Sequence, residues 1–150
     1  MIRKARLEDV KGVYGLIAQH SRNGHILPRP IVELYGQVRD FSVWEDEMGK
    51  LAGCGALEIV WEDLAEIRSL AVEPEYEGHG LGTSLVESLM EEAREMGVER
   101  VFVLTYRIRF FERLGFRRME KSELPHKIWA DCIKCAKFPE CDETALVRSV

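Results

Sequence analysis

Three glycines alternate with other residues in the segment Glu77-Gly78-His79-Gly80-Leu81-Gly82-Thr83, which follows an apolar run and precedes a helical pattern. Glycine adopts positive φ angles without steric cost and lets a ligand approach the backbone closely. The free amides at the start of a helix, together with the helix dipole, attract phosphate groups. The residue types and their spacing therefore predict a turn that binds the phosphates of a small ligand.

The spacing of these glycines differs from that of two widespread phosphate-binding turns. A dinucleotide-binding turn has the form G-x-G-x-x-G, whereas Leu81 alone separates the last two glycines here. A P-loop needs Lys-Ser or Lys-Thr directly after its last glycine, and Thr83 stands there instead. The turn alone leaves a second interpretation open, which is a glycine-capped helix without a ligand.

The order of the predicted elements indicates an α/β fold with a mixed sheet. A broad apolar face predicts a long helix that begins at Gly80 or Gly82 and ends at Gly97. The strand before this helix and the apolar run at 101–105 should be parallel and joined by a right-handed crossover. The other predicted elements are helices at 8–20, 31–38 and 108–114 and strands at 41–45, 51–60, 65–72 and 116–120.

Side chains of the predicted strand at 65–72 should alternate between two faces. On this pattern one face carries Glu66, Arg68, Leu70 and Val72, and the other carries Ile67, Ser69 and Ala71. The strand would thus present a carboxylate and a guanidinium side by side, close to the glycine turn.

Composition and charge exclude several classes of protein. The 150 residues carry a net charge of −5, so the chain lacks the basic surface that a nucleic acid needs. No apolar run approaches the ~20 residues that span a bilayer. The N-terminus also lacks the apolar core of a signal peptide. We therefore expect a cytoplasmic protein with neither a nucleic acid nor a membrane as partner.

Four cysteines are present, and three of them follow the pattern Cys132-x-x-Cys135-x5-Cys141 near the C-terminus. Such a group could chelate zinc with His126 or Asp142 as the fourth ligand. Redox-sensitive thiols or small buried side chains are the alternatives, so no metal is assigned. Cys54, between two glycines of a predicted strand, is expected in the core.

Two motifs resemble those of the GCN5-related N-acetyltransferases. The first is Leu70-Ala71-Val72-x-Pro74-x-Tyr76-x-Gly78-x-Gly80-Leu81-Gly82-x-x-Leu85, and the second, at the family's separation, is Phe110-Phe111-Glu112-Arg113-Leu114-Gly115-Phe116. The resemblance implies a single N-acetyltransferase domain over 1–150, with 124–150 as its cysteine-containing C-terminal segment. It also implies a mixed, mostly antiparallel sheet with a central splayed strand, flanking helices, and acetyl-CoA as cosubstrate.

The same resemblance assigns the donor site. The amides of the glycine turn would bind the pyrophosphate of CoA, and the exposed edge of the splayed strand would bind the pantetheine arm. The implied CoA-binding residues are Leu70, Ala71, Val72, Gly78, His79, Gly80, Leu81, Gly82, Thr83 and Phe111. The family usually has Arg or Gln where this chain has Glu77, so we expect Glu77 to point to solvent.

Acetyl transfer needs a deprotonated amine and hydrogen-bond donors for the developing oxyanion. By resemblance, Glu66 is the general base and the backbone amide of Leu70 is the oxyanion donor. Glu66 could equally be a structural partner of Arg68. Many relatives have a tyrosine at the position of Phe111 that protonates the CoA thiolate, which phenylalanine cannot do. Tyr106 could replace it or could be a core aromatic residue.

Further segments resemble short bacterial amino-acid N-acetyltransferases of the N-acetylglutamate synthase type. They are 61–72, Leu104-Thr105-Tyr106 and the tail Pro125-His126-Lys127-Ile128-Trp129-x-Asp131-Cys132. This resemblance implies acetylation of the α-amino group of L-glutamate, the first step of arginine synthesis. A homodimer is an assembly open to such an enzyme.

Arginine binds carboxylates in a bidentate manner, so cations are expected around an amino-acid acceptor. The candidates are Arg68, Arg29, Arg107 and Lys127. For Arg29 and Lys127 a solvent-exposed cation is an equal alternative. The acceptor could also be another small amine or a protein N-terminus, and a non-catalytic acyl-CoA-binding module is the alternative from another functional class.

Overall fold

The computed structural model describes residues 1–24, 26–124 and 143–150, and it has the predicted α/β architecture. Its seven-stranded sheet has the order β1-β2-β3-β4-β5-β7-β6 and is mostly antiparallel. The strands are β1 (Ile2–Lys4), β2 (Phe41–Glu45), β3 (Leu51–Trp61), β4 (Leu64–Val72), β5 (Arg100–Thr105), β6 (Arg117–Arg118) and β7 (Thr144–Ser149). The helices are α1 (Val10–Arg22), α2 (Ile31–Gly36), α3 (Leu81–Met96) and α4 (Ile108–Arg113). Among the described residues, no helix is long and apolar enough to cross a membrane.

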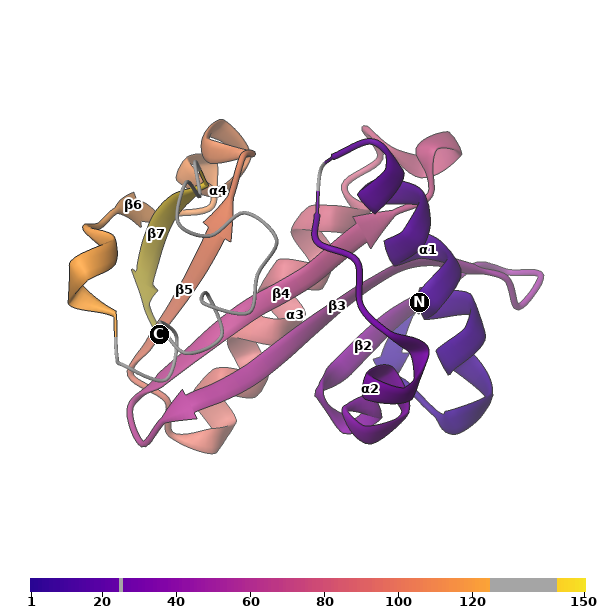
Figure 1. Ribbon diagram of the computed structural model, residues 1–150, viewed down its shortest axis with the longest axis horizontal. Coiled ribbons are helices and arrows are strands. Elements are labelled where there is room, and N and C mark those ends of the chain that lie inside the picture. Colours follow the sequence, from indigo (N-terminus) through magenta and orange to yellow (C-terminus); the bar gives the residue numbers. More distant parts are fainter. Residues whose placement is uncertain (25, 125–142) are drawn as a thin grey trace.

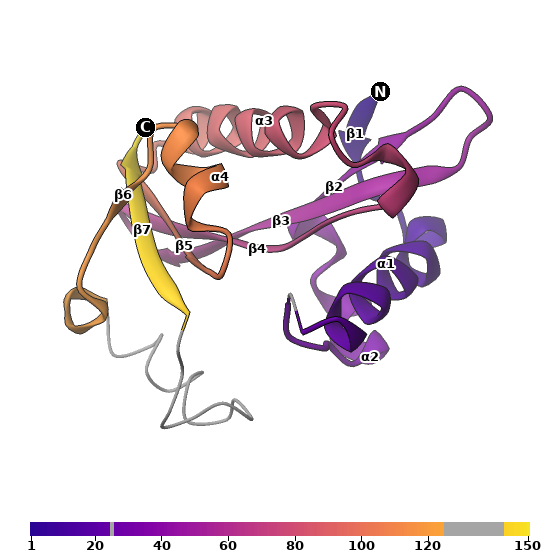
Figure 2. The same ribbon diagram turned by 90° about the horizontal axis from the view of Figure 1, so that it is seen from above.

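The helices cover both faces of the sheet, and each face has its own apolar core. Figure 2 shows α3 and α4 on one face and α1 and α2 on the other. On the α3 face, Leu89 and Phe111 pack with Ile67 of β4. On the α1 face, Ile17 and Leu34 are buried with apolar residues of β2, β3 and β4. The two layers follow from the apolar stripes of the helices, which must each be buried against a sheet face.

The splayed strand expected from the resemblance is β4. In the described part of the chain, β4 and β5 pair in parallel only over Leu64, Ala65 and Glu66. Beyond Glu66 the two strands diverge, as Figure 1 shows, and among the described residues β4 pairs there only with β3, on its other edge. The backbone edge of β4 that faces β5 is therefore available for a ligand over the second half of the strand.

The alternation predicted for β4 is wrong beyond Arg68, because the strand contains a β-bulge. Ala56 pairs with Arg68 but Cys54 pairs with Ala71, so Ser69 and Leu70 together oppose a single residue of β3. Ser69 has a φ of 57°, which is uncommon for a residue other than glycine. One extra residue moves the following side chains to the opposite face.

The bulge separates Leu70 from the charged residues of its own strand. A Cβ added to Gly55 would lie 3.2 Å from Leu70 Cδ1 and 3.2 Å from Leu89 Cδ1, which places Leu70 on the α3 face. Arg68 contacts Glu58 instead, on the face covered by α1 and α2. Glu66 and Arg68 share a face, as predicted, but Leu70 and Val72 do not belong to it.

The C-terminal half of the sheet also differs from the prediction. The strand predicted at 116–120 is only the two-residue strand β6, and the strand β7 was not predicted. β7 lies between β5 and β6 and is antiparallel to both. Its partner β5 lies about 40 residues earlier in the chain. The short apolar run of β7 therefore does not by itself reveal that β7 pairs with β5.

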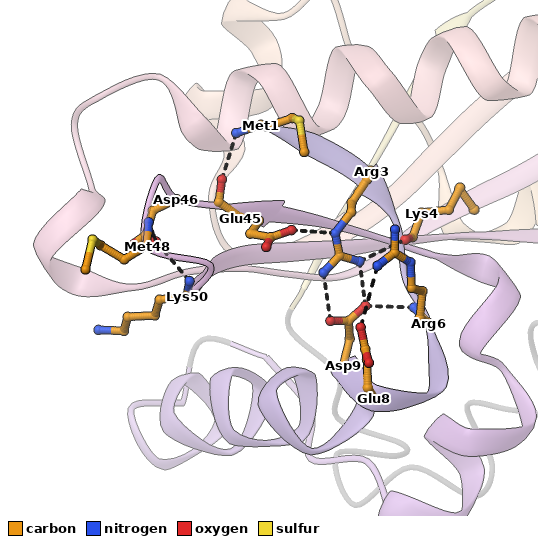
Figure 3. A network of polar contacts seen from close by, with 10 residues as sticks. All are labelled: Met1, Arg3, Lys4, Arg6, Glu8, Asp9, Glu45, Asp46, Met48 and Lys50. Atoms are coloured by element: carbon orange, nitrogen blue, oxygen red, sulfur yellow. Dashed lines mark hydrogen bonds and ion pairs between the residues drawn. The ribbon is translucent and has the colours of Figure 1, made fainter.

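The N-terminal edge of the sheet is held by a charged network, shown in Figure 3. Arg3 of β1 donates to both carboxylate oxygens of Asp9, at 2.7 and 3.0 Å, and to Glu45 of β2 at 2.6 Å. The hydrogen bonds from Arg3 lower the pKa of Asp9 below its usual value. The network joins β1, β2 and the turn before α1, and it plays a structural role.

Candidate active site

The glycine turn has the conformation that a phosphate-binding turn requires. Gly78 and Gly80 both have a φ of 82°, and Gly80 directly precedes the first residue of α3. A Cβ added at either glycine would meet no atom of the described structure within 4 Å. The backbone of the turn is therefore open to a ligand at the N-terminus of a 16-residue helix, where amides and dipole favour an anion.

Gly82 serves a different purpose from the first two glycines. A Cβ at this position would lie 3.3 Å from Phe110 Cζ and 3.9 Å from Val72 Cγ2. Its hydrogen atom thus allows α4 and the end of β4 to pack closely against the first turn of α3. The N-terminus of α3 is therefore held next to the end of β4, where the edge of β4 that faces β5 is unpaired.

The turn is anchored from the β2–β3 hairpin. The hydroxyl of Tyr76, two residues before Gly78, donates to Asp46 Oδ2 at 2.8 Å. The other oxygen of Asp46 accepts from the amides of Met48 and Lys50, at 2.9 Å each. The hydrogen bonds from Lys50 and Tyr76 lower the pKa of Asp46. The carboxylate therefore stays charged and fixes the segment that leads into the turn.

Two charged residues lie beside this turn. The side chain of Glu77 is 45% exposed, in agreement with the expectation that it points to solvent. Its carboxylate lies 3.9 Å from Nη2 of Arg107, which follows β5 on the other side of the splay. Arg107, a candidate for the acceptor carboxylates, is thus placed next to the glycine turn.

The backbone of β4 leads from the turn into the open edge. The Glu73 amide donates to Ala52 of β3 at 2.8 Å, so the carbonyl of Val72, in the same peptide group, points away from β3. That carbonyl accepts from Nε2 of His20, a buried residue of α1, at 2.8 Å. A carbonyl oxygen has two lone pairs, so one is left for a ligand on the open edge.

A cluster of charged side chains lies on the α1 face of β4. Glu58 of β3 accepts from Arg29 at 3.0 Å through Oε1 and from Arg68 at 3.0 Å through Oε2. Glu66 is the register partner of Glu58 across the two strands and is 8% exposed. The cluster combines a buried carboxylate on the splayed strand with a guanidinium, Arg68, that is 26% exposed.

Arg29 holds this cluster from the inside. Its side chain is 3% exposed, and its guanidinium also donates to Ser69 at 3.2 Å, to Glu33 at 2.9 Å and to Gln37. A cation this deeply buried needs such partners, because desolvation would otherwise make its charge very costly.

The chain matches known proteins along its length. The family profile described as acetyltransferase (GNAT) family matches residues 17–116. The chain belongs to the GNAT family. It is 40% identical to an uncharacterized N-acetyltransferase of Chlorobaculum tepidum, over 99% of this chain and 96% of that one. It is 39% identical to the amino-acid acetyltransferase of Mycobacterium tuberculosis, over 86% of this chain and 75% of that one.

A solved structure of the same fold contains coenzyme A. The N-acetylglutamate synthase of Neisseria gonorrhoeae, complexed with coenzyme A and N-acetyl-glutamate, matches with a TM-score of 0.91 and 30% identity. The match covers 99% of this chain and 34% of that one. The protein is an acetyl-CoA-dependent N-acetyltransferase, and the open glycine turn and the unpaired edge of β4 suit a pyrophosphate followed by an extended arm.

The two aromatic candidates of this GNAT protein have different surroundings. Phe111 is 4% exposed and packs edge-on against Phe110 and Phe116, with ring centroids 5.0 and 5.3 Å apart. It belongs to the core beneath α4. Tyr106 is 38% exposed and follows β5.

The sequence did not identify two residues of this candidate site. Some of the residues that it did identify lie outside the described part of the chain. Glu58 and His20 were not among the candidates. The signal for Glu58 was present, since it is the single charged residue in the otherwise apolar run at 51–60. His20, at the end of an apolar helix face, carried no such signal. Lys127 and the cysteine pattern lie outside the described residues, whereas Cys54 is fully buried, as predicted.

Proposed function

We propose that this N-acetyltransferase transfers the acetyl group of acetyl-CoA to the α-amino group of an amino acid, with L-glutamate as the first choice. The observation that carries the proposal is the position of Glu66 and Arg68 on one face of the splayed strand, each next to Glu58 of β3. A carboxylate can accept the proton of an amine, and a guanidinium can bind a substrate carboxylate.

The comparisons support the same class of acceptor. A relative named amino-acid acetyltransferase and a structural neighbour named N-acetylglutamate synthase both align over most of this chain. On this proposal the protein would catalyse the first step of arginine synthesis.

The residues have distinct roles in the proposed reaction. Acetyl-CoA supplies the thioester, whose pyrophosphate the amides from Gly78 to Thr83 would bind. Glu66 takes the proton from the attacking amine, directly or through a water molecule. The amide of Leu70 donates to the carbonyl oxygen as negative charge develops on it. Arg68 binds a carboxylate of the acceptor.

The remaining cations act less directly. Arg29 is too deeply buried to bind a substrate, and we assign it a positioning role through Glu58. Arg107 stands beside Glu77, where it offsets that negative charge close to the pyrophosphate.

No acid is needed at Phe111 for the thiolate to leave. A thiol has a pKa of about 8.5, so the thiolate is a good leaving group at neutral pH. The core position of Phe111 is consistent with this, since its ring packs against other aromatic rings.

The test is turnover of the purified protein with acetyl-CoA and a panel of amino acids and other amines, measured as release of free thiol. We expect acetylation of L-glutamate above the blank. Activity on a polyamine or a peptide N-terminus without activity on any amino acid would refute the proposal.

The role of Glu66 is tested by the pH profile. A general base matters most where the amine is protonated, so Glu66→Gln should lower the rate most at low pH. A profile with the same shape as that of the wild type would remove Glu66 from this role.

A further inference from the structure

The bulge in β4 is held by two buried side chains from other elements. Nη1 of Arg29, in the loop before α2, donates to the hydroxyl of Ser69 at 3.2 Å. The thiol of Cys54, on β3, donates to the Ser69 carbonyl at 3.4 Å. Arg29 is 4% exposed and Cys54 is 0% exposed. Both contacts thus reach the residue that has the positive φ angle, one at its side chain and one at its backbone.

The contact with Cys54 determines where the next amide points. The Ser69 carbonyl and the Leu70 N–H belong to one planar trans peptide group, so they point in opposite directions. Since the carbonyl points toward the Cys54 thiol, the Leu70 N–H points away from that thiol. β5 leaves the edge of β4 beyond Glu66 unpaired, so an amide turned toward this edge would be open to a ligand.

The conformation of Ser69 is strained, and it therefore needs support. Residues other than glycine rarely adopt a positive φ, and they hold it only where the surrounding structure enforces it. A hydrogen bond from a buried guanidinium is stronger than one between neutral groups. Burial raises the pKa of the Cys54 thiol to about 12, so this group remains a protonated donor near neutral pH.

We propose that Arg29 is a positioning residue for catalysis, which holds Ser69 in its bulged conformation so that the Leu70 amide meets the acetyl carbonyl oxygen. The inference rests on the proposed role of Leu70 and extends it to a residue that contacts neither substrate. It also links the two halves of the site, because the same guanidinium holds Glu58, the partner of Arg68.

The test compares two substitutions of Ser69 that remove the same hydroxyl. Glycine adopts a φ of 57° without strain, whereas alanine does not. In ¹⁵N-labelled protein, the Leu70 amide proton should shift downfield in the acetyl-CoA complex relative to the CoA complex. We expect this shift to persist in Ser69→Gly and to be lost in Ser69→Ala, with kcat of the alanine variant about tenfold below that of the glycine variant.

Arg29→Lys adds an independent test, because it keeps the charge but loses the planar fork. It should lower kcat about tenfold in the wild-type background and by less than threefold in the Ser69→Gly background, where the bulge needs no support. The matched control is Glu33→Gln, which removes the charge of another partner of Arg29 without touching the bulge and should leave the Leu70 shift unchanged.

The outcomes separate this inference from the proposed function. The positioning role would be overturned by equal Leu70 shifts in Ser69→Gly and Ser69→Ala. It would also be overturned if Arg29→Lys lowered kcat equally in the wild-type and Ser69→Gly backgrounds. Because the shift is measured without an acceptor, it tests that role even if no amino acid is acetylated. Absence of the shift in the wild type would overturn it together with the role of Leu70.

Discussion

Replacing Glu58 with glutamine removes the charge that lies between Arg29 and Arg68. Removing one partner of a buried ion pair costs about 3–5 kcal/mol, since the remaining charge is left without compensation. The side chain of Glu58 is 16% exposed and that of Arg29 is 3% exposed, so this range applies. Arg29 keeps Glu33 at 2.9 Å, which places the expected loss at the lower end, about 3 kcal/mol.

Thermal and urea unfolding of Glu58→Gln measure this loss. For a domain of this size, 1 kcal/mol corresponds to about 2–4 °C in Tm, so Tm should fall by about 6–12 °C. The control is Glu33→Gln, because Glu33 contacts the same guanidinium but its side chain is 42% exposed. An exposed pair contributes at most about 1 kcal/mol. Equal losses in the two variants would refute the view that Glu58 is the main counter-charge of Arg29.

The same variant should also affect the acceptor. Glu58 holds Arg68 at 3.0 Å, so its loss should raise the acceptor KM about tenfold, equivalent to about 1.4 kcal/mol. The KM for acetyl-CoA should stay within twofold of the wild-type value. A rise in both constants would indicate general damage to the site rather than loss of orientation of Arg68.

Two further predictions concern the N-terminal network and the glycine turn. Because Arg3 lowers the pKa of Asp9 from its usual 3.8, the pair stabilises the fold above about pH 3.8, and this is lost as pH falls through the folded-state pKa. Asp9→Asn should therefore cost about 2 kcal/mol at pH 7 in urea unfolding, and a gap that stays constant down to pH 2 would contradict this. Gly80→Ala forces a residue with a Cβ to a φ of 82°, so it should lower stability by about 1–2 kcal/mol and weaken acetyl-CoA binding about fivefold. An unchanged Kd in isothermal titration calorimetry would show that the turn amides are not needed in their present orientation.

Much of the fold could be predicted because the signals for it lie close together in the chain. The apolar face of α3, the glycines at both of its ends and the apolar run of β5 each reflect preferences of consecutive residues. The bounds predicted from these preferences for α3 and β5 lie within one or two residues of the observed bounds. The same local order predicted the strand, turn and helix that form the proposed donor site.

The bulge could not be predicted, because the usual marker of a positive φ angle is missing there. A glycine in place of Ser69 would have suggested an irregular strand. Ser69 instead takes this conformation through Arg29, which lies 40 positions earlier in the chain. The alternation rule therefore assigned Leu70 to the wrong face.

Residue order along the chain thus decided that a strand, an open glycine turn and a helix would follow one another, and that the turn would suit a phosphate. The tertiary structure alone decided which side chains share a face of β4, that Arg29 is buried rather than exposed, and that β7 separates β5 from β6. The physical reason is the range of the interactions. Backbone preferences act between neighbours, whereas the contacts of a buried charge join residues that only the folded chain brings together.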